Sequence, residues 1–267
     1  MRYFVGGSGP PLLLLHGLGG TAANWNVLAP PLAARFTLLV PDLPGHGGSA
    51  PLAAVPGLGA FADRIALVAK REGLLPAAAV GHSLGGAVAL RLALRQPNAV
   101  TALVLAAAAG ISSASRRAEY ALTLSSIVQP GRRLAPFSRQ MAARPRLRRL
   151  MLGGWGVADA AALSPRAAES FLASPRRNTD TRSAARALVA EDPRLELGSL
   201  RCPCLVLWGA ADRQLPLTDA FEYARRLGAP LRVIPDCGHL LIGERPDACL
   251  DAIVGFLVDG ATGAMRA

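Results

Sequence analysis

The stretch Gly81-His82-Ser83-Leu84-Gly85 is a G-x-S-x-G pentapeptide that lies between an apolar run at 77–80 and a helical pattern at 86–96. The apolar run predicts a strand, and a proline at 97 ends the helical pattern. A sharp strand-to-helix turn strains the backbone of its serine and lifts the hydroxyl clear of the sheet. Gly81 and Gly85 leave room for such a turn. The pentapeptide therefore predicts a nucleophilic Ser83.

Composition is consistent with one large domain, or one domain with an insertion, because the chain has 267 residues of which 51% are hydrophobic. The net charge is +11, and Lys70 is the only lysine among 29 basic residues. This preference for arginine, together with many Ala, Gly and Pro residues, is typical of a coding bias. The sequence has no basic run interleaved with aromatic residues. We therefore expect no nucleic-acid partner.

The excess positive charge is concentrated in one segment. Residues 110–190 contain 14 arginines and four acidic residues, whereas the rest of the chain contains 15 basic and 14 acidic residues. Such a segment can attract an anionic substrate or an anionic membrane surface. The simpler interpretation, which we favour, is a solvated helical surface.

The cysteines, the first residues and the longest uncharged stretch bear on the cellular compartment of the protein. Cys202, Cys204, Cys237 and Cys249 have no zinc-type spacing, so we expect buried free thiols, which suit a reducing environment. The first residues become glycine-rich after position 5, without the pattern of a secretion signal. The longest uncharged stretch, 96–115, has too short an apolar centre to cross a bilayer. We expect a cytoplasmic protein without membrane insertion.

Short apolar runs alternate with helical patterns along most of the chain. The predicted strands are 12–15, 37–40, 77–80, 102–106, 205–208 and 231–234, with a short additional candidate at 2–5. The predicted helices are 25–34, 61–71, 86–95, 218–227 and 247–258. Runs that are apolar on both faces are typical of parallel strands covered by helices on either side. We therefore predict a doubly wound, mostly parallel α/β sheet.

The alternation stops near residue 110 and resumes near residue 202. The stretch between them is rich in arginine and proline and has mostly helical patterning. We predict a core domain formed by 1–109 and 201–267, with a helical cap formed by 110–200.

Acyl transfer by serine needs a base, an acid that orients the base, and donors for the oxyanion. His239 follows the last predicted strand, on a loop able to fold over the edge of the sheet. Asp212 follows the strand at 205–208, and the order Ser, Asp, His is the one expected of α/β-hydrolases. Asp219 and Asp236 are the alternatives, the first inside a helical pattern and the second very close to His239.

The predicted oxyanion donors are two backbone N–H groups. Leu84 follows Ser83 at the start of a helix, and Leu18 lies in a glycine-rich turn directly after the first long strand. Two donors held in place before the reaction are typically worth several kcal/mol of activation barrier, of the order of 3 kcal/mol each.

Five motifs in this order resemble the capped, cofactor-independent branch of the α/β-hydrolase superfamily. They are HGLGG at 16–20, PDLPGHGGS at 41–49, GHSLGG at 81–86, LWGAAD at 207–212 and GHLLIGERP at 238–246. The resemblance covers almost the whole chain. Haloalkane dehalogenases and epoxide hydrolases of this superfamily carry aspartate as the nucleophile, so Ser83 favours acyl chemistry. Meta-cleavage C–C hydrolases often have Trp after the catalytic histidine, where this chain has Leu240.

The sequence therefore predicts a carboxylesterase-like serine hydrolase (EC 3.1.1) that cleaves a small or medium ester, thioester or lactone through an acyl-enzyme on Ser83. Two alternatives stay open: a dedicated C–C hydrolase, lyase or cyclase with the same triad, and a ligand receptor with vestigial hydrolysis. Neither a metal nor another cofactor is expected. The substrate should be small and mostly apolar, or anionic if the arginine-rich segment attracts it. The candidate pocket residues are Trp25, His82, Met151, Trp155 and Leu240.

Overall fold

The computed structural model describes residues 1–53, 57–112 and 134–264 and contains one seven-stranded sheet. The strand order is β1-β3-β2-β4-β5-β6-β7. Only β1 runs antiparallel to its neighbour, and the other pairings are parallel. The strands are β1 (Tyr3–Gly7), β2 (Pro11–Leu15), β3 (Thr37–Pro41), β4 (Ala77–His82), β5 (Val100–Ala106), β6 (Cys204–Gly209) and β7 (Leu231–Ile234).

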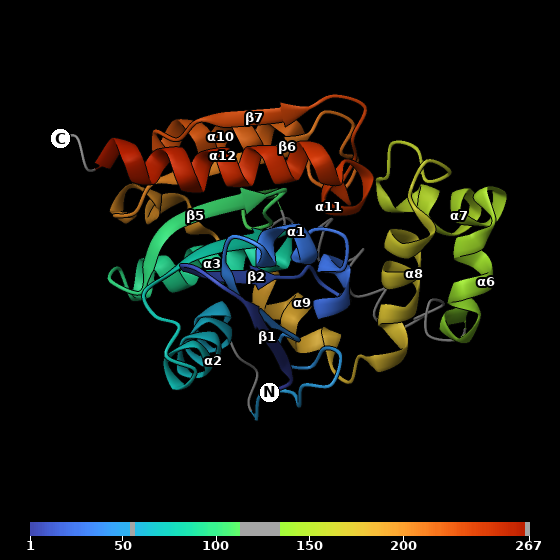
Figure 1. The fold of residues 1–267 in the computed structure, drawn as a ribbon, viewed down its shortest axis with the longest axis horizontal. Helices are drawn as coiled ribbons and strands as arrows, with labels where there is room; N and C mark the ends of the chain where they lie inside the picture. Colours follow the sequence, from blue (N-terminus) through green and yellow to red (C-terminus); the bar gives the residue numbers. More distant parts are fainter. Residues whose placement is uncertain (54–56, 113–133, 265–267) are drawn as a thin grey trace.

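Helices cover both faces of this sheet, as Figure 1 shows. One layer contains α1 and α12, which contact each other, and the opposite layer contains α2 and α3, which also contact each other. These core helices are α1 (Ala29–Ala33), α2 (Leu58–Arg71), α3 (Leu84–Arg95), α10 (Leu217–Leu227), α11 (Leu241–Glu244) and α12 (Pro246–Ala264). The predicted doubly wound α/β class is confirmed.

The central strands are apolar on both faces because both faces are covered. Every side chain of β4 is buried, and its run of three alanines lets the flanking helices approach closely.

The edge strand β7 differs from the prediction. Arg232 and Val233 are exposed there, so the expectation of two buried faces is wrong for this strand.

The single helix predicted over 25–34 is also wrong. A short 3-10 helix, η1 (Ala22–Trp25), ends where that helix should begin, and α1 starts only at Ala29. Pro30 and Pro31 explain the break. Proline lacks the N–H that a helix interior needs and is tolerated only in a first turn, so a helix starts at these residues rather than running through them.

Between β5 and β6 the described chain is helical, and we call residues 134–200 the insertion. Its elements are η3 (Ala135–Phe137), α6 (Ser138–Ala143), α7 (Pro145–Leu152), η4 (Gly153–Trp155), α8 (Pro165–Ala173), η5 (Ser174–Arg177), α9 (Thr181–Val189), η6 (Pro193–Leu195) and η7 (Leu197–Ser199). Part of the predicted cap, 113–133, lies outside the described residues. The division into cap and core stays a prediction.

The insertion has an outer and an inner part. In Figure 1, α6 and α7 lie at one end of the molecule, with α8 between them and the sheet. By contrast, α9 contacts α2 and lies against the core. Arg91 of α3 forms an ion pair with Glu191 just after α9. The last part of the insertion is therefore packed as a helical layer of the core.

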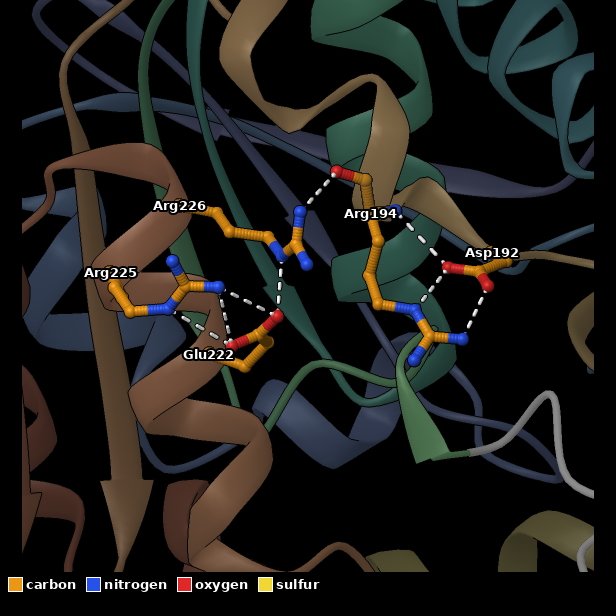
Figure 2. A network of polar contacts seen from close by, with 5 residues as sticks. All are labelled: Asp192, Arg194, Glu222, Arg225 and Arg226. Atoms are coloured by element: carbon orange, nitrogen blue, oxygen red, sulfur yellow. Dashed lines mark hydrogen bonds and ion pairs between the residues drawn. The ribbon is translucent and has the colours of Figure 1, made fainter.

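The end of the insertion also meets α10 through an exposed polar network (Figure 2). Asp192 accepts hydrogen bonds from the backbone and side chain of Arg194, and Arg226 donates to the carbonyl of Arg194 at 3.3 Å. Glu222 accepts from both Arg225 and Arg226. Exposed ion pairs of this kind contribute about 0–1 kcal/mol each, so the network neutralises charge more than it stabilises the fold.

Candidate active site

Ser83 is the single residue between β4 and α3, and its backbone is strained. Its φ is 53° and its ψ is −119°, a conformation that costs a residue other than glycine about 1–3 kcal/mol. The surroundings hold it there. The Ser83 N–H donates to the Ala106 carbonyl at 3.0 Å, and the Ser83 carbonyl accepts from Ala109 at 3.1 Å. The end of β5 thus fixes the turn from both sides.

Neighbouring glycines make the turn sterically possible. A Cβ on Gly81 would lie 2.3 Å from the Gly85 carbonyl oxygen, and one on Gly85 would lie 2.2 Å from the Leu15 carbonyl oxygen. Neither position has room for a side chain. The packing therefore agrees with the expectation that Gly81 and Gly85 leave room for the turn at Ser83.

His239 and Asp212 are in direct contact on two neighbouring loops. His239 Nδ1 lies 2.8 Å from Asp212 Oδ2, and both side chains are almost completely buried. The other carboxylate oxygen of Asp212 accepts from the backbone of Gln214 and Leu215. Since a carboxylate only accepts, Nδ1 carries the proton and Nε2 keeps a lone pair, as a general base requires.

The two alternative acids lie elsewhere. Asp219, on α10, accepts the N–H of Ser112 at 3.0 Å in a different loop. Asp236 is exposed and has φ of 49°. Asp212 is therefore the carboxylate that the tertiary structure brings to His239.

The segment expected to provide the second oxyanion donor runs beside Ser83. A Cβ on Gly17 would lie 3.2 Å from Ser83 Cβ and 3.1 Å from His82 Nδ1. The following residues turn back through a hydrogen bond from Gly20 to the Gly17 carbonyl. Leu84 is the first residue of α3, so its N–H has no acceptor one turn earlier in that helix. Leu84 thus follows Ser83 at the start of α3, and Leu18 follows Gly17, the residue that lies beside Ser83.

Three other histidines, His16, His46 and His82, are buried in or beside these loops. His16 donates from Nδ1 to the Gly17 carbonyl and accepts at Nε2 from the Leu43 N–H. His82 Nε2 donates to the His239 carbonyl at 2.8 Å. Burial lowers the pKa of His16 and of His82 to about 3, and burial also lowers the pKa of His46. All three are therefore neutral at physiological pH.

These histidines predict a loss of stability in mild acid. Each has a folded-state pKa below its unfolded value of about 6.5, so the unfolded chain binds up to three more protons as the pH falls below 6.5. The contribution of these histidines to the free energy of unfolding should be complete above pH 6.5. As the pH decreases below 6.5, the free energy of unfolding should fall by up to about 4 kcal/mol per pH unit.

Urea unfolding at intervals between pH 7.5 and 4.5 measures this slope. The variant His16→Gln should lose a large part of it, because the buried His16, whose pKa is lowered to about 3, is then absent. A flat stability curve between pH 6.5 and 4.5 would contradict the neutral assignment.

The insertion is hydrogen-bonded to the loops of the site. Asn178 donates to the Gly19 carbonyl at 2.7 Å and accepts from the Gly47 N–H at 3.0 Å. Thr21 and Asn24 both contact the hydroxyl of Ser174 at 3.2 Å. The loop after β2 is therefore tied to the insertion, although the sequence assigned no role to these polar residues.

The candidate pocket residues have different surroundings. Trp25 is completely buried, and its Nε1 has no hydrogen-bond partner among the residues that the structure describes. His82 and Leu240 are buried next to His239, where they support the histidine loop. Met151 is half-buried and packs against the hydrophobic core cluster. The backbone of Trp155 ends η4, and its side chain lies outside the described part of the structure.

Two further residues beside His239 were missed from the sequence. Glu244 lies within the quoted motif GHLLIGERP but had no role, and its carboxylate binds the backbone on both sides of His239. Gly156 of the insertion accepts the His239 N–H at 2.7 Å. The spacing of an acid five residues after the histidine was the available signal for Glu244, whereas no local signal pointed to Gly156.

Other features of the described residues include free cysteines and a hollow at one end of β4. The four cysteines are unpaired, and burial raises the pKa of the Cys237 thiol to about 12. In the described ranges, no group of three or more His, Cys, Asp or Glu side chains is arranged to hold a metal. None of the described helices combines the length and hydropathy that a membrane crossing requires. A hollow at Leu75 and Pro76 lies at the opposite end of β4 from Ser83.

The sheet, the strained serine and the acid–base pair define the class of protein as an α/β-hydrolase. The model of the alpha/beta hydrolase family matches residues 12–252, and the chain belongs to this family. The chain is 34% identical to a pimeloyl-[acyl-carrier protein] methyl ester esterase of Aromatoleum aromaticum, over 90% of this chain and 95% of that protein. It is 33% identical to a magnesium-chelatase 30 kDa subunit of Rhodobacter capsulatus, over 96% of this chain and 88% of that protein.

Other relatives are longer or are known as structures. The chain spans 66% of the length of a dihydrolipoyllysine-residue acetyltransferase component of an acetoin cleaving system from Pseudomonas putida, which is 30% identical over 96% of this chain. Among solved structures, a thermophilic esterase from Thermogutta terrifontis is 26% identical, with a TM-score of 0.76 over 97% of this chain and 93% of that one. Relatives of this chain thus include proteins named for different activities.

Proposed function

We propose that this protein is a serine hydrolase that cleaves a small or medium carboxylic ester, thioester or lactone. The observation that carries the proposal is the 2.8 Å contact between His239 Nδ1 and the buried carboxylate of Asp212. This pair belongs to loops packed against the Ser83 turn, because His82, the residue before the serine, donates to the His239 carbonyl.

The proposed reaction has two steps. Ser83 Oγ attacks the carbonyl carbon while His239 Nε2 takes the hydroxyl proton, and the N–H groups of Leu18 and Leu84 stabilise the oxyanion. The imidazolium then gives that proton to the leaving alcohol or thiol. In the second step His239 removes a proton from water and the hydroxide attacks the acyl-enzyme. The imidazolium then returns that proton to Ser83 Oγ as the acyl C–O bond breaks, and the acid is released.

Asp212 keeps the imidazole in the required tautomer throughout both steps and stabilises its positive charge. The insertion acts as a cap in this proposal, since Asn178 and Ser174 attach it to the loop that carries Leu18. The relative from Aromatoleum aromaticum, which is a methyl ester esterase by name, supports an ester as the substrate. The relative described as a chelatase subunit makes a direct test of turnover necessary.

The test is hydrolysis of p-nitrophenyl esters from acetate to decanoate, followed by trapping of the acyl-enzyme. Turnover with an optimum chain length, together with a mass increase on the peptide that contains Ser83, would support the proposal and would measure the acyl pocket. A folded protein that turns over none of these esters, nor simple methyl esters, would contradict it and favour a dedicated metabolite or a receptor role.

The arginines of the insertion could add substrate selectivity. In the described part of the insertion none of the exposed arginines before residue 190 forms an ion pair, in contrast to the network of Figure 2. These arginines are at positions 139, 144, 146, 149, 166, 176, 177, 182 and 186. Unpaired charges of one sign raise the local concentration of oppositely charged substrates.

If this field attracts anionic substrates, kcat/KM for a carboxylate-bearing ester should fall about tenfold between 10 mM and 500 mM salt, because ions screen the attraction. The kcat/KM of a neutral ester of the same length should stay constant and serves as the control. An equal response of the two esters would show that the charge is only a solvated surface.

A further inference from the structure

A buried carboxylate next to the histidine loop has no role in the reaction above. Glu244, the last residue of α11, is only 9% exposed. Its Oε2 accepts the N–H of Gly238 at 2.9 Å and the N–H of Ala158 at 2.8 Å, and its Oε1 accepts the N–H of Leu240 at 3.0 Å. Charge-assisted hydrogen bonds of this type are about twice as strong as neutral ones.

These bonds enclose His239 on both sides. Gly238 and Leu240 donate to Glu244, and the intervening N–H of His239 donates to the Gly156 carbonyl at 2.7 Å. Three consecutive backbone amides are therefore bound by two acceptors, one of which belongs to the insertion. Since the backbone direction at His239 sets where its imidazole can point, these acceptors control the approach of the ring to Asp212.

Residues 156–158 of the insertion pack closely against the loop that carries His239. The Gly156 carbonyl oxygen lies 1.9 Å from where a Cβ on Gly238 would be, so only glycine fits there. A Cβ on Gly156, whose φ is +73°, would lie 3.4 Å from His239 Cβ and 2.9 Å from Gln214 Cγ. Residues 156–158 of the insertion thus touch the base loop and the acid loop, and Glu244 binds them to the base loop.

A carboxylate is needed for this arrangement. Both of its oxygens are acceptors, and each faces at least one backbone donor. A carboxamide has one acceptor oxygen and one donor NH2, so it leaves at least one buried N–H facing another donor. A buried charge is expensive unless it is fully hydrogen-bonded, and three backbone donors satisfy this condition at Glu244.

We propose that Glu244 is a positioning residue that fastens the His239 loop to residues 156–158 of the insertion, so that the insertion forms part of the support of the base. This inference rests on the proposed function for its kinetic consequence only. Its structural consequence, coupling between the insertion and the histidine loop, holds whatever the substrate is.

The first test is Glu244→Gln, with kinetics and hydrogen exchange measured on the same folded protein. We expect kcat for the best ester to fall about 10- to 100-fold with KM nearly unchanged, because a misplaced base slows the chemical step more than binding. The amides of Ala158, Gly238 and Leu240 should exchange about tenfold faster in the variant. Unchanged exchange, or faster exchange with unchanged kcat, would overturn the proposal.

Gly238→Ala provides a second, independent variant. It pushes the Gly156 carbonyl and the Ala158 amide away from the histidine loop without changing the carboxylate of Glu244. We expect the same fall in kcat and the same faster exchange at residues 156–158. A Gly238→Ala protein with wild-type kcat would overturn the proposal even if Glu244→Gln does not fold.

Asp219→Asn is the matched control. This carboxylate is also buried and also accepts a backbone N–H, that of Ser112, but it does so in a loop after β5. We expect normal kcat and normal exchange at residues 238–240. If the wild-type protein hydrolyses no ester, the proposed function fails, while the exchange measurements still decide whether Glu244 couples the two segments.

Discussion

Replacing Ser83 with alanine is expected to lower kcat for ester hydrolysis about a million-fold, to the level that binding and the oxyanion donors give alone. The reason is the loss of the attacking oxygen, since no acyl-enzyme can form. The fold should not change, because alanine keeps the Cβ of serine in a turn whose surroundings fix φ at 53°. Continuous release of p-nitrophenolate measures the loss.

A matched readout separates chemistry from folding in this experiment. The thermal unfolding midpoint of Ser83→Ala should lie within about 2 °C of the wild type, because the hydroxyl contributes little to packing. Residual activity above about one per cent of wild type would mean that another group attacks the ester, and it would remove Ser83 from the proposed mechanism.

Replacing Asp212 with asparagine is expected to lower kcat about ten-thousand-fold with little change in KM. Asparagine fits the site, but the backbone N–H groups of Gln214 and Leu215 keep its oxygen and turn its NH2 toward His239. Nδ1 of the imidazole must then accept instead of donate. The proton moves to Nε2, and His239 can no longer take a proton from Ser83.

The control for this variant is Asp236→Asn, which makes the same chemical change three residues before His239. Asp236 is exposed, and asparagine tolerates its φ of 49°. We expect its kcat to stay within about twofold of wild type. If Asp212→Asn kept more than about one tenth of wild-type kcat, a different carboxylate would have to orient the base.

Much of the core could be predicted from the sequence because the signals are local. The runs at 12–15 and 77–80 are apolar at every position, as strands covered on both faces must be, and the turn at Ser83 is marked by its own glycines. The sequence failed where a neighbour in space decided the outcome. Val233 is apolar but exposed on β7, the last strand in the order of the sheet.

The site shows the same division between local and tertiary information. Chain order and loop position singled out Asp212 over Asp219 and Asp236, but only the packing of two loops brings its Oδ2 to 2.8 Å from His239 Nδ1. The loops are held together by a hydrogen bond from Ala211 to the Cys237 carbonyl, a contact between backbone groups that no side-chain pattern encodes.

By itself the sequence determined the fold class and the serine turn, and it singled out Asp212 and His239 as candidates, because each follows from a local pattern of residues. The tertiary structure alone decided how the insertion meets the site. The carbonyl of Gly156 accepts the His239 N–H, and the carboxylate of Glu244 binds the amides of Gly238, Leu240 and Ala158. Such contacts depend on where the chain returns in space, and residue identity does not record that.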